Sequence, residues 1–199
     1  MPLEKLKEEI SGLDIYLLDQ ILKGRYLYNS KILDAGCGSG RNLTWFYDNH
    51  FDVYGVDSDP VKIDEIKEKY SKLSNQFTIE YLDSLSFNND AFDHVICNAV
   101  LHFAKSKSHF IAMISELVRV LKPSRTLFIR MTYKLPSDFN NVSVGAGVYQ
   151  LNDQSQRFLL TASLLEEICN LFSLKPKEPF KYVSVANKYN MCVLILQKS

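Results

Sequence analysis

Apolar side chains follow two different rhythms along this chain, and these rhythms predict alternating helices and strands. Over residues 3–22 they recur at steps of three and four, which places one apolar stripe along a helix that ends near Gly24. Five later runs are short, apolar and bounded by turn-forming residues, as strands are. These predicted strands are 31–35, 51–57, 77–81, 92–97 and 125–131. The predicted helices between them are 41–49, 60–70 and 106–121.

Strand–helix alternation of this kind predicts a parallel sheet with helices on both faces. The pattern changes at residues 133–160, which are rich in Ser, Asn, Asp, Gln and Gly. A segment of that length inside a compact domain is typical of a lid or a binding segment. A helix then begins at Ser163, whose Ser-x-x-Glu spacing fits a capping box. Two strand-like runs, 179–186 and 190–197, follow and are joined by a predicted hairpin turn at 187–190.

The predicted fold is therefore α/β: a doubly wound, Rossmann-like sheet of seven strands, mostly parallel, with a C-terminal antiparallel hairpin and helices on both faces. With 199 residues, 46% of them hydrophobic and 23% charged, the chain has room for one such domain and no sign of disorder. The N-terminus is charged from its fourth residue, and no apolar run reaches the roughly 20 residues of a membrane span. We expect no signal peptide, no membrane segment and a cytoplasmic protein. The four cysteines are scattered without a C-x-x-C pair, which predicts reduced thiols and no metal site.

The formal net charge is zero, with 23 basic and 23 acidic side chains. A protein that neutralises the phosphates of duplex nucleic acid is normally basic, so that class of partner is disfavoured. The total hides a division along the chain, however. Residues 31–100 hold six basic and twelve acidic side chains, whereas residues 101–199 hold thirteen basic and six acidic ones. The two halves of the domain are therefore expected to carry opposite charge.

Three of the eight glycines, Gly36, Gly38 and Gly40, lie directly after one predicted strand and directly before a helix. Glycine there lets the backbone turn sharply and direct its amide groups at a ligand. Asp34 lies at the end of this strand and Asp57 at the end of the next, where a carboxylate can accept both hydroxyls of an adenosine ribose. We interpret the cluster as a nucleotide-type binding loop; the alternative is a structural turn beside solvated aspartates.

Arg41 stands where the dinucleotide fingerprint G-x-G-x-x-G needs a small residue, and G-x-x-x-x-G-K-[ST] is absent as well. The glycine loop and four further motifs instead resemble the class I S-adenosylmethionine-dependent methyltransferases. These motifs are Leu33-Asp-Ala-Gly-Cys-Gly-Ser-Gly40, Val56-Asp-Ser-Asp-Pro60, Asp83-Ser-Leu85, 92–103 and 120–128. They follow the family's order across about residues 30–132. Ser124 departs from the glycine that usually follows the Lys-Pro turn, and the Gly-Arg-Asn triplet at 40–42 is similar to the tellurite-resistance branch.

The resemblance implies S-adenosylmethionine as the cofactor. Asp34 and the 36–40 loop would hold its methionine end, Asp57 its ribose and Asp83 its adenine amino group. The Cys97–Asn98 backbone would lie beside the methionine amine. The predicted cofactor-binding residues are Asp34, Gly36, Cys37, Gly38, Gly40, Asn42, Asp57, Ser58, Asp83, Ser84 and Asn98.

Three residues are candidates for the substrate side of the site. His102 follows the fourth strand and has the ordinary pKa of a general base; the alternative is a loop histidine that bonds only to the backbone. Arg130 and Tyr133 end the fifth strand, where they would meet an anionic or aromatic acceptor. The alternative is that Arg130 is a charged residue at the edge of the sheet and Tyr133 a ring packed in the core.

We therefore expect an enzyme that transfers a methyl group to a small molecule by in-line displacement. The expected parts of this single domain are a helical cap at 1–28, a cofactor-binding core at 30–132, a substrate lid at 133–160, and a C-terminal helix and hairpin at 161–199. The alternatives are a protein or RNA methyltransferase, a non-catalytic S-adenosylmethionine-binding protein, and a nicotinamide or flavin oxidoreductase. An acidic cofactor half suits a sulfonium cation, and the basic half favours an anionic acceptor. We expect a monomer or a homodimer.

Overall fold

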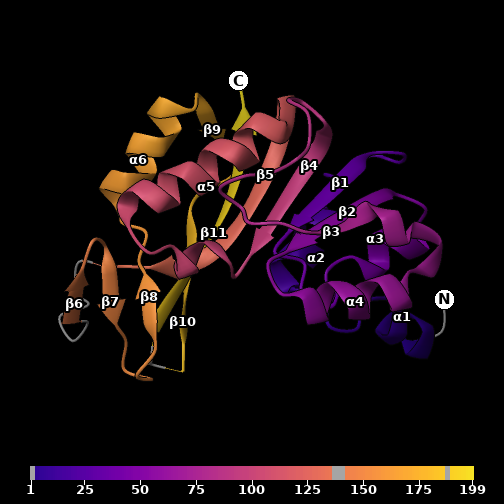
Figure 1. The fold of residues 1–199 in the computed structure, drawn as a ribbon, viewed down its shortest axis with the longest axis horizontal. Helices are drawn as coiled ribbons and strands as arrows, with labels where there is room; N and C mark the ends of the chain where they lie inside the picture. The colour runs from indigo at the N-terminus through magenta and orange to yellow at the C-terminus, as the bar shows by residue number, and fades with distance from the viewer. Residues whose placement is uncertain (1–2, 136–141, 187–188) are drawn as a thin grey trace.

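The main sheet of the computed structural model confirms the predicted fold class. The structure describes residues 3–135, 142–186 and 189–199, and its largest sheet has eight strands, seven of them in the order β10-β11-β5-β4-β1-β2-β3 (Figure 1). The strands are β1 (Lys31–Ala35), β2 (Asp52–Asp57), β3 (Phe77–Ile79), β4 (Phe92–Asn98), β5 (Leu121–Tyr133), β9 (Leu174–Pro176), β10 (Lys181–Val185) and β11 (Tyr189–Lys198). The strands β1 to β5 pair in parallel, and β11 runs antiparallel to β5, β9 and β10. The short edge strand β9 is absent from the sequence-based prediction.

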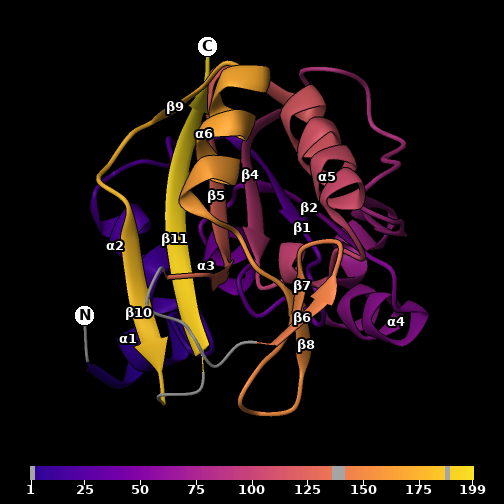
Figure 2. The same ribbon diagram turned by 90° about the vertical axis from the view of Figure 1, so that its left-hand side faces the viewer.

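Helices cover both faces of this sheet. The helices are α1 (Leu3–Glu9), α2 (Ile15–Leu22), α3 (Thr44–Asp48), α4 (Pro60–Lys69), α5 (Lys107–Val120) and α6 (Ala162–Leu171), with 3₁₀ turns η1 (Ser71–Gln76) and η2 (Leu101–Phe103). Figure 2 shows α5 and α6 on one side of β5 and β11 and α2 on the other. Neighbouring strand residues therefore enter different cores: Leu33 packs with the side chains of α5 and α6, and Ile32 with those of α2, α3 and α4. No helix in these three segments has the length and apolar character needed to cross a membrane.

The N-terminal prediction of one helix over 3–22 is wrong, because the segment folds as two helices. Gly12 adopts a left-handed conformation (φ +76°), which ends the first helical run. Asp14 then caps α2, its carboxylate accepting a hydrogen bond of 3.0 Å from the Tyr16 amide. Only the second helix uses its apolar stripe for the core: Leu17 is fully buried, whereas Leu3 is 63% exposed.

The predicted start of the last helix is also displaced. Thr161, rather than Ser163, caps α6, and its hydroxyl accepts a hydrogen bond of 3.2 Å from the Leu164 amide. The antiparallel pairing of β10 with β11 confirms the C-terminal hairpin. Two residues of its predicted turn, Asn187 and Lys188, lie outside the described residues.

The segment predicted as a lid contains a second, separate sheet. Strands β6 (Val142–Gly145), β7 (Val148–Gln150) and β8 (Gln156–Phe158) pair antiparallel in that order. The segment rejoins the main sheet where the Leu160 amide bonds to the Thr132 carbonyl at the end of β5. Figure 1 shows these strands standing beside the end of β5, the edge at which the parallel strands finish.

A buried histidine makes stability depend on pH. His94 in β4 is 3% exposed and its Nδ1 lies 2.6 Å from the Thr126 hydroxyl; burial lowers the pKa of its ring to about 4. The unfolded chain, with a histidine pKa near 6.5, binds more protons between pH 6.5 and 4, so the free energy of unfolding falls as the pH falls through this window. We expect a loss of about 2 kcal/mol per such histidine between pH 7.5 and 5, and His102 contributes in the same way.

Urea denaturation of wild type and His94→Gln at a series of pH values measures this effect. Between pH 7.5 and 5, the change in the unfolding free energy of the variant should differ by about 2 kcal/mol from that of wild type, whatever its absolute stability, because the loss contributed by His94 is absent. The exposed His50 provides the control, and His50→Asn should keep the wild-type slope. An unchanged slope in His94→Gln would contradict the assignment.

Candidate active site

The carboxyl ends of β1, β2, β4 and β5 meet at one edge of the sheet, where open α/β sheets bind their ligands. This edge brings together four predicted residues: Asp34 near the end of β1, Asp57 of β2, Asn98 of β4 and Arg130 of β5. They come from a span of nearly 100 positions of the sequence, and parallel pairing alone places them side by side.

The glycine loop after β1 is held down by backbone bonds. The Gly36 and Cys37 amides both donate to the Val56 carbonyl at 2.8 and 2.9 Å, and the Gly38 amide donates to a carboxylate oxygen of Asp57 at 2.9 Å. Gly36 has φ +85°, and a Cβ there would stand 2.2 Å from the nearest methyl group of Val100. The loop therefore requires glycine at position 36 for both conformation and space.

Gly38 and Gly40 have different surroundings. A Cβ on Gly38 would meet nothing within 4 Å, so the loop is open at this point, whereas one on Gly40 would lie 2.6 Å from the side chain of Ile66 in α4. Gly38 thus leaves room above the backbone for a ligand. Gly40 allows the close approach of α4.

Two polar side chains beneath the loop are buried without partners. Asp34 is fully buried and Asn98 is 6% exposed, yet neither carboxylate oxygen and neither amide atom has a hydrogen-bond partner among the described residues. Burial raises the pKa of Asp34 to about 8; the charge of Arg41 opposes this shift and that of Asp57 adds to it. Buried polar groups are nearly always paired in folded proteins. These atoms therefore fit a ligand that carries both donors and acceptors, as an amino-acid moiety does.

A cavity of about 480 Å³, which we call the cofactor cavity, opens beside the loop. It brings together five of the predicted residues: Gly36, Asp57, Ser58, Asp83 and Ser84. Its other lining residues are Glu80, Tyr81, Leu82, Val100, Phe103, Lys105, His109 and Met113, which the sequence prediction missed. Several of them lie just after the end of β3 or β4. Their position after a predicted strand is the sequence signal that could have identified them. A carboxylate oxygen of Asp83 lies 3.4 Å from Nε2 of His109.

Six predicted cofactor residues do not line this cavity; besides Asp34, Gly38 and Asn98 these are Cys37, Gly40 and Asn42, which support the loop. The buried Cys37 packs against Gly55, and burial raises the pKa of its thiol, so it stays protonated. The Asn42 side chain accepts a hydrogen bond of 3.2 Å from the Asp14 amide and ties the loop to the N-terminal segment. Gly40 packs on α4, as described above.

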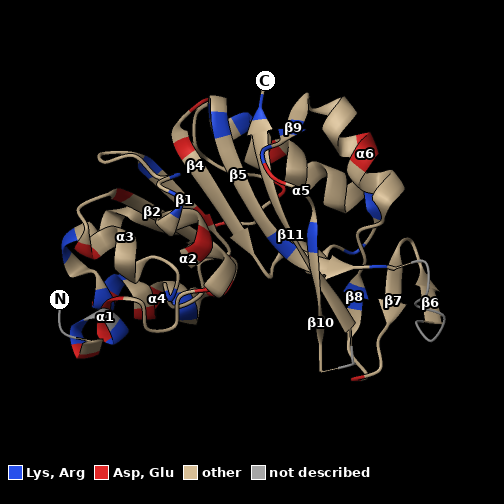
Figure 3. Cartoon of the chain, turned by 180° about the vertical axis from the view of Figure 1, so that it is seen from behind, with Lys and Arg blue, Asp and Glu red and all other residues tan. Residues whose placement is uncertain are grey.

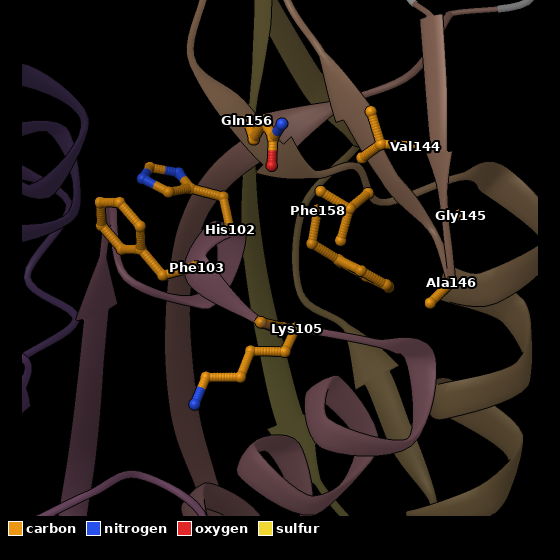
Figure 4. A pocket seen from close by; sticks show the side chains of 10 residues that line it. His102, Phe103, Lys105, Val144, Gly145, Ala146, Gln156 and Phe158 are labelled. Atoms are coloured by element: carbon orange, nitrogen blue, oxygen red, sulfur yellow. The ribbon is translucent and has the colours of Figure 1, made fainter.

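His102 lies between two further cavities on the substrate side. The larger, about 470 Å³, is the η2 cavity, formed where η2 faces the small sheet (Figure 4). The smaller, about 220 Å³, is the strand-end cavity, which lies at the ends of β4 and β5. Phe103 and Lys105 line both the η2 cavity and the cofactor cavity, and His102 lines both the η2 cavity and the strand-end cavity, so the η2 cavity adjoins each of the other two.

The three predicted substrate-side residues differ in their surroundings. His102 is 7% exposed and its Nδ1 has no partner among the described residues; burial, assisted by the charge of Arg157, lowers the pKa of the ring to about 4. Arg130 lines the strand-end cavity and pairs with Asp14 at 2.5 Å. Tyr133 is buried 4.7 Å from the ring of Phe180 and lines none of the three cavities.

Comparison with known proteins shows what the domain is similar to. Residues 32–124 match the family model described as a methyltransferase domain. An uncharacterized methyltransferase, YodH of Bacillus subtilis (strain 168), is 33% identical over 98 residues, which are 48% of this chain and 40% of that protein. The match thus spans less than half of the curated relative.

Solved structures share the fold. The PH0226 protein of Pyrococcus horikoshii OT3 has a TM-score of 0.71 at 21% identity over 93% of this chain and 89% of its own. A SAM-dependent methyltransferase of Methanosarcina mazei has a TM-score of 0.72 at 22% identity, over 89% of this chain and 96% of its own. The 1,6-didemethyltoxoflavin-N1-methyltransferase of Burkholderia thailandensis was solved with S-adenosylhomocysteine. It has a TM-score of 0.71 at 16% identity, over 98% of this chain and 82% of its own. Residues 32–124 are therefore similar to a methyltransferase domain, and the chain shares its fold with these solved structures.

Proposed function

We propose that the protein transfers a methyl group from S-adenosylmethionine to a small-molecule acceptor. The observation that carries this proposal is the pair of buried, unpartnered polar side chains, Asp34 and Asn98, under a glycine loop beside a cavity of about 480 Å³. Small-molecule acceptors are favoured because the spaces next to this cavity, of about 470 and 220 Å³, are partly lined by the chain's own segment 142–160. The toxoflavin enzyme with the same fold acts on a small molecule.

The residues divide the binding of the cofactor among them. Asp34, Asn98 and the glycine loop would hold the methionine end, and Asp57 the ribose. Asp83 and Ser84 would hold the adenine end. When bound, S-adenosylmethionine supplies an electrophilic methyl group on a sulfonium, which a nucleophile attacks in line. Phe103, shared by the cofactor cavity and the η2 cavity, would help to exclude water from the space between them.

The charges lining the cavities favour an anionic acceptor. Asp57, Glu80 and Asp83 line the cofactor cavity. The spaces on the other side of Phe103 contain Arg130 and Arg157, with Asp153 as their one carboxylate among the described lining residues, and Lys105 lines both the cofactor cavity and the η2 cavity. Figure 3 shows the basic segment on β8 that contributes to this side. The charge division of the sequence is thus reproduced around the site. We propose that segment 142–160 covers the acceptor.

His102 is proposed to contact the acceptor as a neutral hydrogen-bonding group. With a pKa of about 4 its ring is uncharged at physiological pH, and it is a weak base. It therefore suits an acceptor whose nucleophile arrives already deprotonated. We expect His102→Phe to lower turnover about tenfold or more, since a buried hydrogen bond is lost, and to leave the affinity for S-adenosylhomocysteine unchanged.

Turnover of S-adenosylmethionine to S-adenosylhomocysteine with a panel of acceptors tests the proposed activity and the effect of His102→Phe on it. Calorimetry measures the affinity for S-adenosylhomocysteine. His50→Asn, which changes an exposed histidine, should behave as wild type. Full activity in His102→Phe would remove His102 from the site. Binding of S-adenosylhomocysteine without turnover of any acceptor would instead support a cofactor-binding protein, and no binding at all would overturn the proposed function.

A further inference from the structure

The strand-end cavity is built from segments that lie far apart in the sequence. Ala99 and His102 follow β4, Thr132 belongs to β5, Arg157 to β8 and Met191 to β11. At about 220 Å³ it has room for a small planar group next to the η2 cavity. Its lining contains two guanidinium groups, whose states of pairing differ.

Arg157 has a guanidinium without a counter-charge. It is half-buried, with its guanidinium carbon 4.7 Å from the centre of the Phe103 ring. One of its nitrogens donates to the Gln156 carbonyl at 2.8 Å, and no carboxylate of the described residues lies within 4.0 Å of it. A guanidinium offers five N–H donors in a planar fork. Arg157 therefore retains both charge and donors for a ligand in the cavity.

Arg130, the second guanidinium, is already largely neutralised. Its Nη1 pairs with Asp14, while its Nε is buried without a partner among the described residues. Arg130 thus contributes hydrogen-bond donors to the cavity and little net positive charge.

The remaining polar groups of the lining are consistent with one net positive charge inside. Asp153 is exposed at the rim, where one of its oxygens accepts hydrogen bonds of 3.0 and 2.6 Å from the amide and hydroxyl of Ser155. His102 is buried and neutral, and its Nδ1 has no partner among the described residues. The charge that acts on the His102 ring is that of Arg157. An anion in the cavity would meet the guanidinium of Arg157, which has no carboxylate within 4.0 Å among the described residues.

We propose that the strand-end cavity is a subsite for a carboxylate of the acceptor, held by Arg157, with His102 and Arg130 as further hydrogen-bonding groups. The acceptor is then a small carboxylic acid, an inference that rests on the proposed function. A carboxylate fits better than a phosphate, because its two oxygens match the guanidinium fork and its single charge matches the single uncompensated cation.

Binding of simple carboxylates tests this subsite without any turnover. The probes are acetate and benzoate, each compared with its uncharged amide, acetamide and benzamide, by NMR titration of the full-length protein with and without S-adenosylhomocysteine. The variants are Arg157→Gln, which removes the charge, and Arg157→Lys, which keeps the charge but loses the fork. Arg125→Gln is the matched control, because Arg125 is an arginine of β5 whose partner is Asp93.

We expect wild type and Arg125→Gln to prefer at least one carboxylate over its amide by about tenfold or more. Arg157→Gln should lose this preference, Arg157→Lys should keep part of it, and both should bind S-adenosylhomocysteine as wild type does. Equal binding of acids and amides by wild type, no binding of either acid, or an unchanged preference in Arg157→Gln would each overturn the subsite. The proposed function fails separately, if wild type does not bind S-adenosylhomocysteine.

Discussion

Replacing Gly36 by alanine is expected to abolish cofactor binding and to destabilise the domain. The residue has φ +85°, a conformation that costs an L-residue roughly 1–2 kcal/mol. The added Cβ would also stand 2.2 Å from a methyl group of Val100, and overpacking of this kind costs typically 1–3 kcal/mol. Relief of the clash requires Val100 or the loop to move, and both line the cofactor cavity. We expect a loss of about 3 kcal/mol in unfolding free energy and at least a hundredfold loss of affinity for S-adenosylhomocysteine.

Gly24→Ala separates the cost of the backbone conformation from the cost of the steric clash. Gly24 has nearly the same backbone conformation, φ +67°, but a Cβ there would meet nothing within 4 Å. This variant should lose only about 1 kcal/mol and bind the cofactor normally. Urea denaturation and calorimetry measure the two quantities. If Gly36→Ala kept wild-type affinity, the close approach of the loop to Val100 would not matter for the site.

Replacing Asp57 by alanine is expected to weaken S-adenosylhomocysteine binding at least tenfold. Its carboxylate lines the cofactor cavity and accepts hydrogen bonds from the Gly38 amide at 2.9 Å and the Asp59 amide at 3.0 Å. The substitution therefore removes the acceptor for the ribose hydroxyls and also releases the glycine loop. Each charge-assisted hydrogen bond lost at such a site costs roughly 1.5–3 kcal/mol.

Asp59→Ala provides the matched control two residues away. Asp59 caps α4, accepting a hydrogen bond from the Val61 amide, and does not line the cofactor cavity. Loss of the cap should cost about 1 kcal/mol of stability and leave the affinity nearly unchanged. Unchanged affinity in Asp57→Ala would contradict the ribose assignment, and equal affinity losses in both variants would show that α4, rather than the carboxylate, controls binding.

Local sequence patterns predicted the sheet and one part of the site. The core strands are apolar because both faces are covered, so their positions could be recognised without knowing their neighbours. The glycine loop, Asp34 and Asp57 were found for a similar reason, since each lies at the end of such a strand or directly after it. The break at Gly12 was missed because the apolar spacing of residues 3–22 continues across it. The edge strand β9 has three residues, too few for a periodic signal.

The other part of the site depends on contacts between distant segments. The placement of Phe103 and Lys105 between two cavities follows from the way η2 meets the small sheet. Arg157 stands in a polar segment that has no pattern of its own, and only the folded chain shows that its guanidinium lines a cavity with His102 and has no counter-charge among the described residues. Burial of His102, which decides its protonation, is likewise a tertiary property.

The contact between Asp14 and Arg130 has a consequence for the acceptor. Asp14 begins α2, bonds through its amide to Asn42, and neutralises the guanidinium that borders the strand-end cavity. An acceptor carboxylate in that cavity would therefore compete with Asp14 for Arg130. Competition of this kind is reciprocal: an acceptor that draws Arg130 away loosens the docking of the N-terminal helices by the same free energy with which their docking weakens the acceptor. If the strand-end cavity holds the acceptor carboxylate as proposed, the contact between Asp14 and Arg130 would lower the affinity for that acceptor.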